Sequence, residues 1–108
     1  MAKESEQKVQ ELQFLEQNFQ NILLQKQAFE LELGETNSAM EELETSNEEV
    51  YKIIGQLMIK TEKNKVKNDL SQKLKLIELR IKTLDKQEKS INDRIEIIKK
   101  EIFEDSKK

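Results

Sequence analysis

The chain has 108 residues, of which 38% are charged and 5% are aromatic, with two glycines and no proline, cysteine, histidine or tryptophan. This length allows one small domain. Because the usual zinc ligands and the commonest general base are missing, we predict that the chain is not an enzyme and that it holds neither a metal nor a cofactor.

Membranes and nucleic acids are excluded as partners by apolar content and by charge. No apolar run approaches the roughly 18 residues of a membrane-spanning helix, and residues 1–8 are polar. The net charge of -3 gives the whole chain no electrostatic footprint for nucleic acid. We therefore expect a cytoplasmic protein that binds neither membrane nor nucleic acid.

The first half of the chain has a heptad pattern that predicts a long helix over residues 1–48. Positions spaced by alternating steps of three and four are apolar at nine of twelve places, which is typical of a coiled coil. Gly34 is the one helix-breaking residue within it, and glycine costs roughly 1 kcal/mol relative to alanine there. The seam positions are Leu12, Leu15, Phe19, Ile22, Lys26, Phe29, Leu33, Thr36, Met40, Leu43, Asn47 and Val50.

The middle of the chain loses this spacing and gathers β-branched residues, which predicts a β-hairpin over residues 49–61. With Gly55 first in a two-residue type II′ turn, Ile54 faces Leu57 and Ile53 faces Met58. Both faces of such a hairpin are apolar, so it must be buried against something else, and pairing of its edges with other copies would bury it. The alternative is that helix continues through residues 48–62.

The second half repeats the heptad spacing and predicts a helix over residues 62–106. Only one of its ten seam positions, Glu88, is polar. The predicted fold is therefore mainly α, a single domain over residues 1–108 in which a long antiparallel two-helix coiled coil has a short β-hairpin between its helices. The seam positions are Leu70, Leu74, Ile77, Ile81, Leu84, Glu88, Ile91, Ile95, Ile98 and Ile102.

The charges of the two halves favour a chain that folds back on itself. Residues 1–54 hold 4 basic and 12 acidic side chains, whereas residues 55–108 hold 15 basic and 10 acidic ones. The halves of one chain therefore attract each other, while like halves of two copies repel. In an antiparallel hairpin, Lys26 and Glu88 come to the same level, where an opposite-charge pair would fix the register. The alternative is that both side chains reach water independently.

Several apolar residues lie off the two seams. Val9, Phe14, Ile97 and Phe103 are near the free ends of the predicted helices, where they form a candidate surface for non-native chains together with seam residues that fray. We assign eight residues to this client-binding surface: Val9, Leu12, Phe14, Leu15, Ile97, Ile98, Ile102 and Phe103. Four more off-seam residues, Leu24, Leu31, Leu76 and Leu79, either contact a neighbouring subunit or thicken the core.

The order of elements and two segments carry a resemblance to a known family. Residues 50–60 read VYKIIGQLMIK and residues 79–89 read LRIKTLDKQEK. They resemble the hairpin and the second helix of the prefoldin beta subunit, archaeal type. The single hairpin and the short chain are similar to the beta class rather than to the alpha class.

The resemblance implies an ATP-independent chaperone, a holdase. In that family two alpha and four beta subunits form a hexamer by joining their hairpins into a β-barrel. The ends of the coiled coils bind unfolded client proteins and deliver them to a group II chaperonin. By position, the residues of the assembly hairpin are Val50, Tyr51, Ile53, Ile54, Gly55, Leu57, Met58 and Ile59.

A structural coiled-coil adaptor or tether without chaperone activity is the alternative function. It would use the heptads to dimerise two chains and would need no strand. An assembly larger than a dimer, with some β structure, distinguishes the holdase from it.

Overall fold

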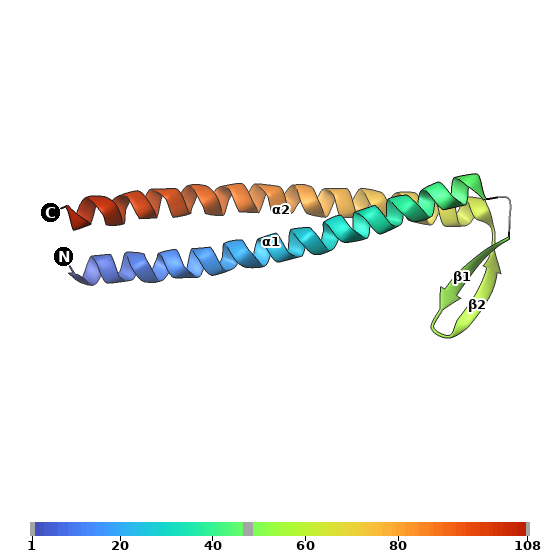
Figure 1. The fold of residues 1–108 in the computed structure, drawn as a ribbon, viewed down its shortest axis with the longest axis horizontal. Helices are drawn as coiled ribbons and strands as arrows, with labels where there is room; N and C mark the ends of the chain where they lie inside the picture. Colours follow the sequence, from blue (N-terminus) through green and yellow to red (C-terminus); the bar gives the residue numbers. More distant parts are fainter. Residues whose placement is uncertain (1, 47–48, 108) are drawn as a thin grey trace. The chain divides into compact units, whose positions relative to one another are not determined.

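The computed structural model describes residues 2–46 and 49–107. Helix α1 (Ala2–Thr45) is followed by strands β1 (Val50–Ile54) and β2 (Leu57–Thr61) and by helix α2 (Lys63–Ser106), as Figure 1 shows. The predicted fold class, two long helices joined by a short antiparallel hairpin, is confirmed. The first helix was expected to reach residue 48 but ends at Thr45, and Ser46 lies outside it. Residues 47 and 48 lie outside the described residues.

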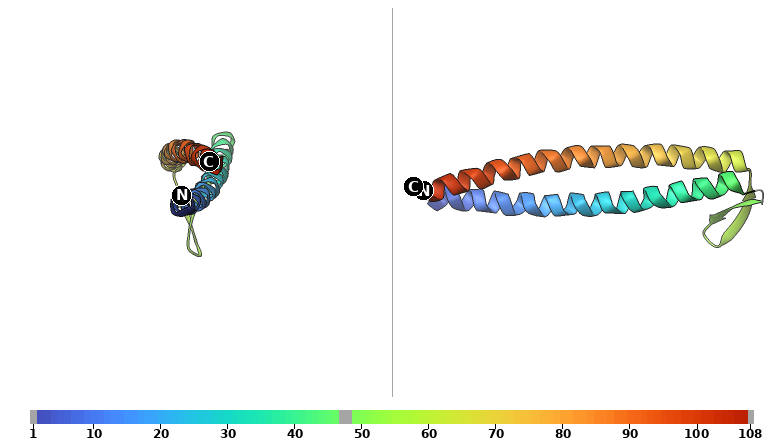
Figure 2. Two further views of the ribbon diagram at one scale, coloured as in Figure 1. Left: turned by 90° about the vertical axis from the view of Figure 1, so that its left-hand side faces the viewer. Right: turned by 45° about the horizontal axis from the view of Figure 1, so that its top comes forward.

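Contacts divide the chain into two compact units. Met1–Ala28 and Ile81–Lys108 form what we call the terminal unit, and Phe29–Arg80 forms the hairpin unit. In the terminal unit, the N-terminal end of α1 lies beside the C-terminal end of α2 (Figure 2). Its buried core consists of Ile22, Leu84, Ile95 and Ile98, all of which are predicted seam residues.

The core of the hairpin unit is built from the same heptad positions. Leu43 and Ile77 are its buried apolar residues, and Thr36 is a buried polar one. The Thr36 hydroxyl donates a hydrogen bond to the Glu32 carbonyl at 2.7 Å, which removes the penalty of burying a polar group. All predicted seam positions among the described residues are at least half-buried, so the heptad pattern identified the helix contact.

The strands pair in the predicted register. Ile54 lies opposite Leu57 and Ile53 lies opposite Met58 in the antiparallel ladder. Gly55 has φ of 60°, whereas Gln56 does not have a positive φ. A positive φ at the first central residue alone defines a type II′ turn, which suits the twist of a hairpin.

The junction between α1 and the hairpin is held by side-chain and backbone contacts. The Ser46 amide donates to the Glu42 carbonyl at 3.0 Å, and the Lys63 ammonium donates to the Ser46 carbonyl at 3.0 Å. Lys67 forms an ion pair with Glu44, with 3.6 Å between Nζ and Oε1. The lysines that follow the hairpin thus offset the acidic end of α1, where the helix dipole is itself negative.

Within the part of the chain that the structure describes, neither helix contains a stretch long and apolar enough to cross a membrane.

Candidate functional site

The hairpin exposes apolar side chains on both of its faces. Ile54, Leu57 and Ile59 share one face, while Ile53 and Met58 share the other. The apolar side chains of residues 51–59 are between 46% and 71% exposed. Exposed apolar surface on both faces of an isolated two-stranded ribbon is unfavourable in water. The exposed set is Tyr51, Ile53, Ile54, Leu57, Met58 and Ile59, whereas Val50 is half-buried and Gly55 forms the turn.

A polar cluster lies at the open end of this hairpin. The Tyr51 hydroxyl donates to Glu49 Oε2 at 2.6 Å, and Lys60 Nζ donates to Glu49 Oε1 at 3.0 Å. These hydrogen bonds, that of Tyr51 first, lower the pKa of Glu49. The same bond raises the pKa of the Tyr51 phenol, because the carboxylate stabilises its protonated form. The cluster links β1 to β2, since Tyr51 and Lys60 are partners in the ladder.

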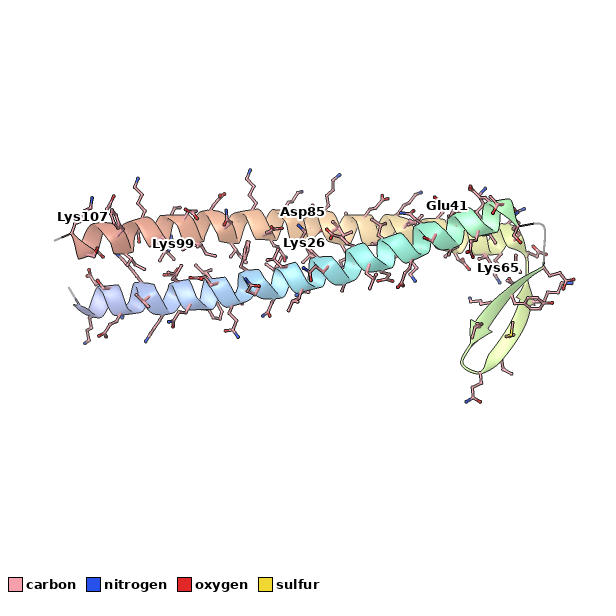
Figure 3. The ribbon with its side chains drawn as sticks, in the orientation of Figure 1. Lys26, Glu41, Lys65, Asp85, Lys99 and Lys107 are labelled. Atoms are coloured by element: carbon pink, nitrogen blue, oxygen red, sulfur yellow. The ribbon has the colours of Figure 1, made fainter. Side chains whose placement is uncertain are left out.

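The terminal unit contains a charged group within the helix seam. Lys26 Nζ lies 2.6 Å from Glu88 Oε2 and 2.8 Å from Asp85 Oδ1, and Figure 3 shows Lys26 and Asp85 pointing toward each other between the helices. The hydrogen bonds to Asp85 and Glu88 raise the pKa of Lys26. The pairing of Lys26 with Glu88, derived from the register of an antiparallel hairpin, is confirmed. The contribution of Asp85 was missed because Asp85 lies off the heptad seam.

A second charged pair continues the seam toward the free ends of the helices. Lys8 Nζ lies 2.9 Å from Asp105 Oδ2, and this hydrogen bond raises the pKa of Lys8. Lys8 and Asp105 occupy the next heptad positions beyond Leu12 and Ile102. The seam therefore reaches further along both helices than its apolar residues indicate. Continuing the steps of three and four residues through polar positions would have predicted this pair from the sequence.

Four of the predicted client-binding residues are exposed and lie on two sides of the helix pair. Val9, Phe14, Ile97 and Phe103 are all exposed. The hydrogen bond between Lys8 and Asp105 shows that these two residues lie at the same height along the helix pair. Val9 therefore lies at nearly the same height as Phe103. By heptad position, Val9 and Phe103 lie on one side, and Phe14 and Ile97 on the other.

The other four predicted client-binding residues support the helix contact. Leu12, Leu15 and Ile102 are half-buried. Ile98 is 0% exposed, so in this fold it offers no surface to another chain. Its heptad position places it inside the seam, where it is buried between the two helices.

Charged groups border the exposed apolar residues of the terminal unit. Arg94 Nη2 lies 3.2 Å from Glu11 Oε1. Glu11 and Arg94 stand one turn from Phe14 and Ile97 on the same two helices, so this ion pair lies beside that apolar side. On the other side, Lys107 Nζ lies 4.6 Å from the centre of the Phe103 ring, within range of a cation–π contact.

Open depressions lie on the surface of the described residues. One is lined by Ser5, Glu6, Val9 and Gln10 at the start of α1, and another borders the charged group at Asp85 and Glu88. No group of three or more acidic side chains in the described part of the chain is arranged to hold a metal ion. The features that stand out are exposed apolar surfaces rather than a pocket.

Comparison with known proteins accounts for this combination of helix pair and exposed hairpin. The model of a family described as prefoldin subunit matches residues 6–107. The chain belongs to the prefoldin subunit family. This is a family of chaperone subunits, and the resemblance to the archaeal prefoldin beta subunit is confirmed.

Relatives named prefoldin subunit beta match over most of their length. The chain is 35% identical to that of Thermococcus onnurineus over 94 residues, which cover 85% of this chain and 81% of the relative. It is 33% identical to that of Pyrococcus horikoshii over 94 residues, which cover 85% of this chain and 80% of the relative.

A solved prefoldin structure matches the fold. The crystal structure of the prefoldin beta subunit from Thermococcus strain KS-1 superposes with a TM-score of 0.86 at 32% identity, covering 92% of this chain and 89% of that one. The beta2 subunit from the same strain has the same fold, with a TM-score of 0.73 at 20% identity and coverage of 82% and 96%.

Proposed function

We propose that this chain is a holdase subunit, which keeps unfolded polypeptides from aggregating without using ATP. The observation that carries the proposal is apolar surface exposed at two places. One is the hairpin, and the other is formed by the free ends of the helices. A hairpin that is apolar on both faces needs other hairpins around it, and exposed aromatic and aliphatic side chains at the helix ends are suited to non-native chains.

The proposed assembly uses the hairpin surface. Joining hairpins edge to edge would cover Ile53, Ile54, Leu57 and Met58 and would satisfy the free edges of β1 and β2. Membership of the prefoldin subunit family supports two alpha and four beta subunits as the composition, with a group II chaperonin as the recipient of the client and the cytoplasm as the place of action.

The proposed client surface consists of Val9, Phe14, Ile97 and Phe103. Their contacts with a client would be apolar and without fixed hydrogen-bond geometry, which allows many sequences to bind. Two sides, each carrying exposed apolar residues, allow an extended client to pass around the helix ends. Leu12, Leu15 and Ile102 would add to this surface only where the ends of the helices separate.

The test of this proposal is suppression of aggregation. The double variant Phe14→Ser and Phe103→Ser is compared with Leu24→Ser, which changes an exposed leucine of α1 away from the helix ends. Light scattering of an unfolding model protein is followed with each assembled variant present. We expect the double variant to lose most of its protection and Leu24→Ser to retain it. Full protection by the double variant, with its assembly intact, would refute the proposed client surface.

A further inference from the structure

The two exposed phenylalanines of the terminal unit lie in different charge surroundings. Phe103 is 59% exposed and Phe14 is 63% exposed, so the two rings offer similar apolar surface. On a helix, the side chains three and four residues away are the neighbours of a given side chain. The neighbours of Phe103 are Lys99, Lys100, Ser106 and Lys107, and those of Phe14 are Gln10, Glu11, Gln17 and Asn18.

Three lysines border Phe103. Lys99, Lys100 and Lys107 are all exposed, and Lys107 Nζ lies 4.6 Å from the centre of the Phe103 ring. Figure 3 shows Lys99 and Lys107 at the C-terminal end of α2. None of the three lysines forms an ion pair with another residue of the described part of the chain. We call Phe103 and these three lysines the basic aromatic site.

Acidic side chains close to Phe103 in the sequence do not neutralise this site. Asp105 Oδ2 lies 2.9 Å and Glu101 Oε2 lies 3.9 Å from Lys8 Nζ, so both contact a lysine of α1 instead. Glu104 is adjacent to the phenylalanine, and adjacent residues point about 100° apart around a helix. Glu96 stands two turns earlier, about 10 Å along the helix. The site therefore keeps a local excess of positive charge, although the whole chain has a net charge of -3.

On the same side of the terminal unit, α1 adds apolar surface. Val9 is 39% exposed and lies at nearly the same height as Phe103. Glu6 stands one turn before Val9, and Glu16 stands two turns after it. Because both acids belong to the other helix, the lysines one turn from Phe103 are the charges that a ligand on its ring meets first.

Phe14 lies in neutral surroundings instead. Gln10 and Gln17, one turn before and after it, carry uncharged amides. The charge of Glu11 is matched by Arg94, whose Nη2 lies 3.2 Å from Glu11 Oε1. Phe14 therefore offers apolar contact without favouring either sign of charge.

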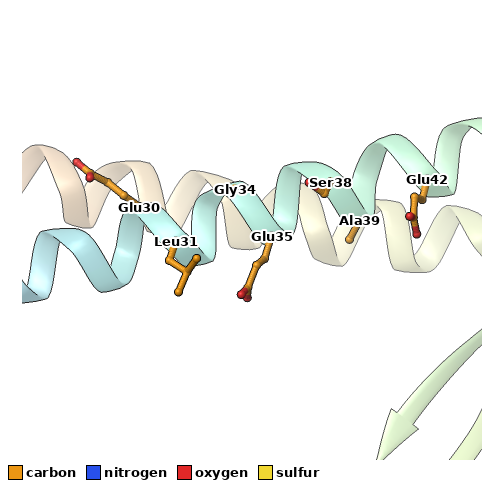
Figure 4. Close-up of a pocket in the computed structure, with 7 residues that line it drawn as sticks. All are labelled: Glu30, Leu31, Gly34, Glu35, Ser38, Ala39 and Glu42. Atoms are coloured by element: carbon orange, nitrogen blue, oxygen red, sulfur yellow. The ribbon is translucent and has the colours of Figure 1, made fainter.

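An exposed leucine of the hairpin unit lies in acidic surroundings. Leu31 is 66% exposed and borders an open depression, which Glu30, Glu35 and Glu42 also line. Figure 4 shows Leu31 and Glu35 projecting from the same side of α1. Exposed apolar side chains of this chain therefore differ in the sign of the charge around them.

The basic aromatic site suits an extended segment that carries an acidic residue beside an apolar one. Residues of an extended chain are about 3.3 Å apart, and one turn of helix rises about 5.4 Å. With an apolar side chain on the Phe103 ring, a carboxylate one or two residues along the segment thus comes within reach of a lysine one turn away. A basic residue at the same place in the segment would be repelled.

We propose that the basic aromatic site binds acidic segments of non-native chains, in which an apolar residue stands beside aspartate or glutamate. The inference rests on the proposed function, since it adds a charge preference to one residue of the client surface. Phe14 binds segments of either charge, so the two sides of the helix ends differ in the clients that they favour. One exposed ion pair changes a binding equilibrium by up to about fivefold, and two lysines engaged together change it by about tenfold.

Three synthetic peptides test the charge preference. They contain the same leucines and phenylalanines, spaced by glutamate, by glutamine or by lysine, and their binding to the assembled full chain is measured by fluorescence anisotropy. In 0.1 M salt we expect the glutamate peptide to bind about tenfold more tightly than the glutamine peptide, and the lysine peptide to bind more weakly than both. In 1 M salt, where the screening length falls from about 10 Å to about 3 Å, this preference should be lost.

Two triple variants locate the preference. The test variant combines Lys99→Gln, Lys100→Gln and Lys107→Gln. The matched control combines Lys82→Gln, Lys86→Gln and Lys89→Gln, three exposed lysines of the same helix that are at least about 20 Å along it from Phe103. Each variant loses three positive charges and gains three good helix formers, so overall charge and helix propensity are matched. We expect the test variant to bind the glutamate and glutamine peptides alike and the control to keep the preference.

The uncharged glutamine peptide separates this proposal from the proposed function. If the double variant Phe14→Ser and Phe103→Ser binds it as the natural chain does, or if no peptide binds, the client surface fails and the basic aromatic site with it. If its binding needs the phenylalanines, three results overturn the basic aromatic site alone: no preference for the glutamate peptide, a preference that persists in 1 M salt, or equal losses in the test and control variants. Circular dichroism checks that each variant is folded, and the salt dependence of the natural chain requires no variant.

Discussion

Replacing Ile98 with alanine is expected to destabilise the terminal unit far more than the same replacement at the adjacent Ile97. Ile98 is 0% exposed and Ile97 is 50% exposed, although the two residues are chemically identical. Removing a fully buried isoleucine side chain costs about 2–5 kcal/mol, which combines the lost burial with the cavity left behind. Half-burial of Ile97 contributes about 1 kcal/mol.

The assay is unfolding of the full chain by heat, followed by circular dichroism at a helical wavelength. The resulting difference of about 1–4 kcal/mol between the variants corresponds to a thermal midpoint at least about 4 °C lower for Ile98→Ala. At a temperature where both variants are folded, Ile97→Ala should weaken protection of an unfolding client more than Ile98→Ala. Equal midpoints for the two variants would refute the assignment of Ile98 to the core and of Ile97 to the surface.

Three further changes test the charged groups and the helix. Lys26→Glu should lower the thermal midpoint by placing three carboxylates together, and adding Glu88→Lys should restore most of the loss; no recovery in the double variant would argue against a direct pair. The only tyrosine, Tyr51, should ionise above its ordinary pKa of 10.0 in a spectrophotometric titration, and Glu49→Gln should bring the value down. Because folding raises the pKa of Tyr51, the hydrogen bond of its phenol contributes fully to stability below the unfolded pKa of 10.0. That contribution is lost as the pH rises through the pKa of the folded protein. Finally, Gly34→Ala should raise the stability of the chain by about 1 kcal/mol, seen as a higher urea midpoint, since α1 gains a better helix former in open space; an unchanged midpoint would contradict this.

The sequence was informative wherever the chain interacts with itself. Heptad spacing selects Ile77, Leu84 and Ile95 as core residues because burial on one helix face requires that period. The two-residue turn that begins with Gly55 predicts the register of the strands, because a turn of that length sets Ile54 opposite Leu57. The level of Lys26 and Glu88 follows from the position of the turn, since both residues lie 31 residues from Leu57 and the chain folds back there.

Some contacts could not be predicted from the sequence, because they depend on the length and direction of side chains or on a partner molecule. Asp85 joins Lys26 through the length and direction of its side chain, which spacing along the chain does not describe. Ile98 and Ile97 are adjacent apolar residues, and whether the helix end frays at Ile98 depends on packing around it. Leu31 is 66% exposed and Leu76 is 65% exposed, so neither lies in the core of its own helix pair, and heptad spacing does not predict what else they contact.

The mass of the complex formed with a prefoldin alpha-class subunit tests the central claim most directly. The chain is mixed with such a subunit, and the product is measured by light scattering after size separation, with a hairpin variant, Ile53→Ser and Met58→Ser, as the control. We predict a hexamer of two alpha and four beta subunits for the natural chain and a much smaller species for the variant. A simple dimer of the natural chain, unchanged by the alpha-class subunit, would contradict this account and favour a coiled-coil tether.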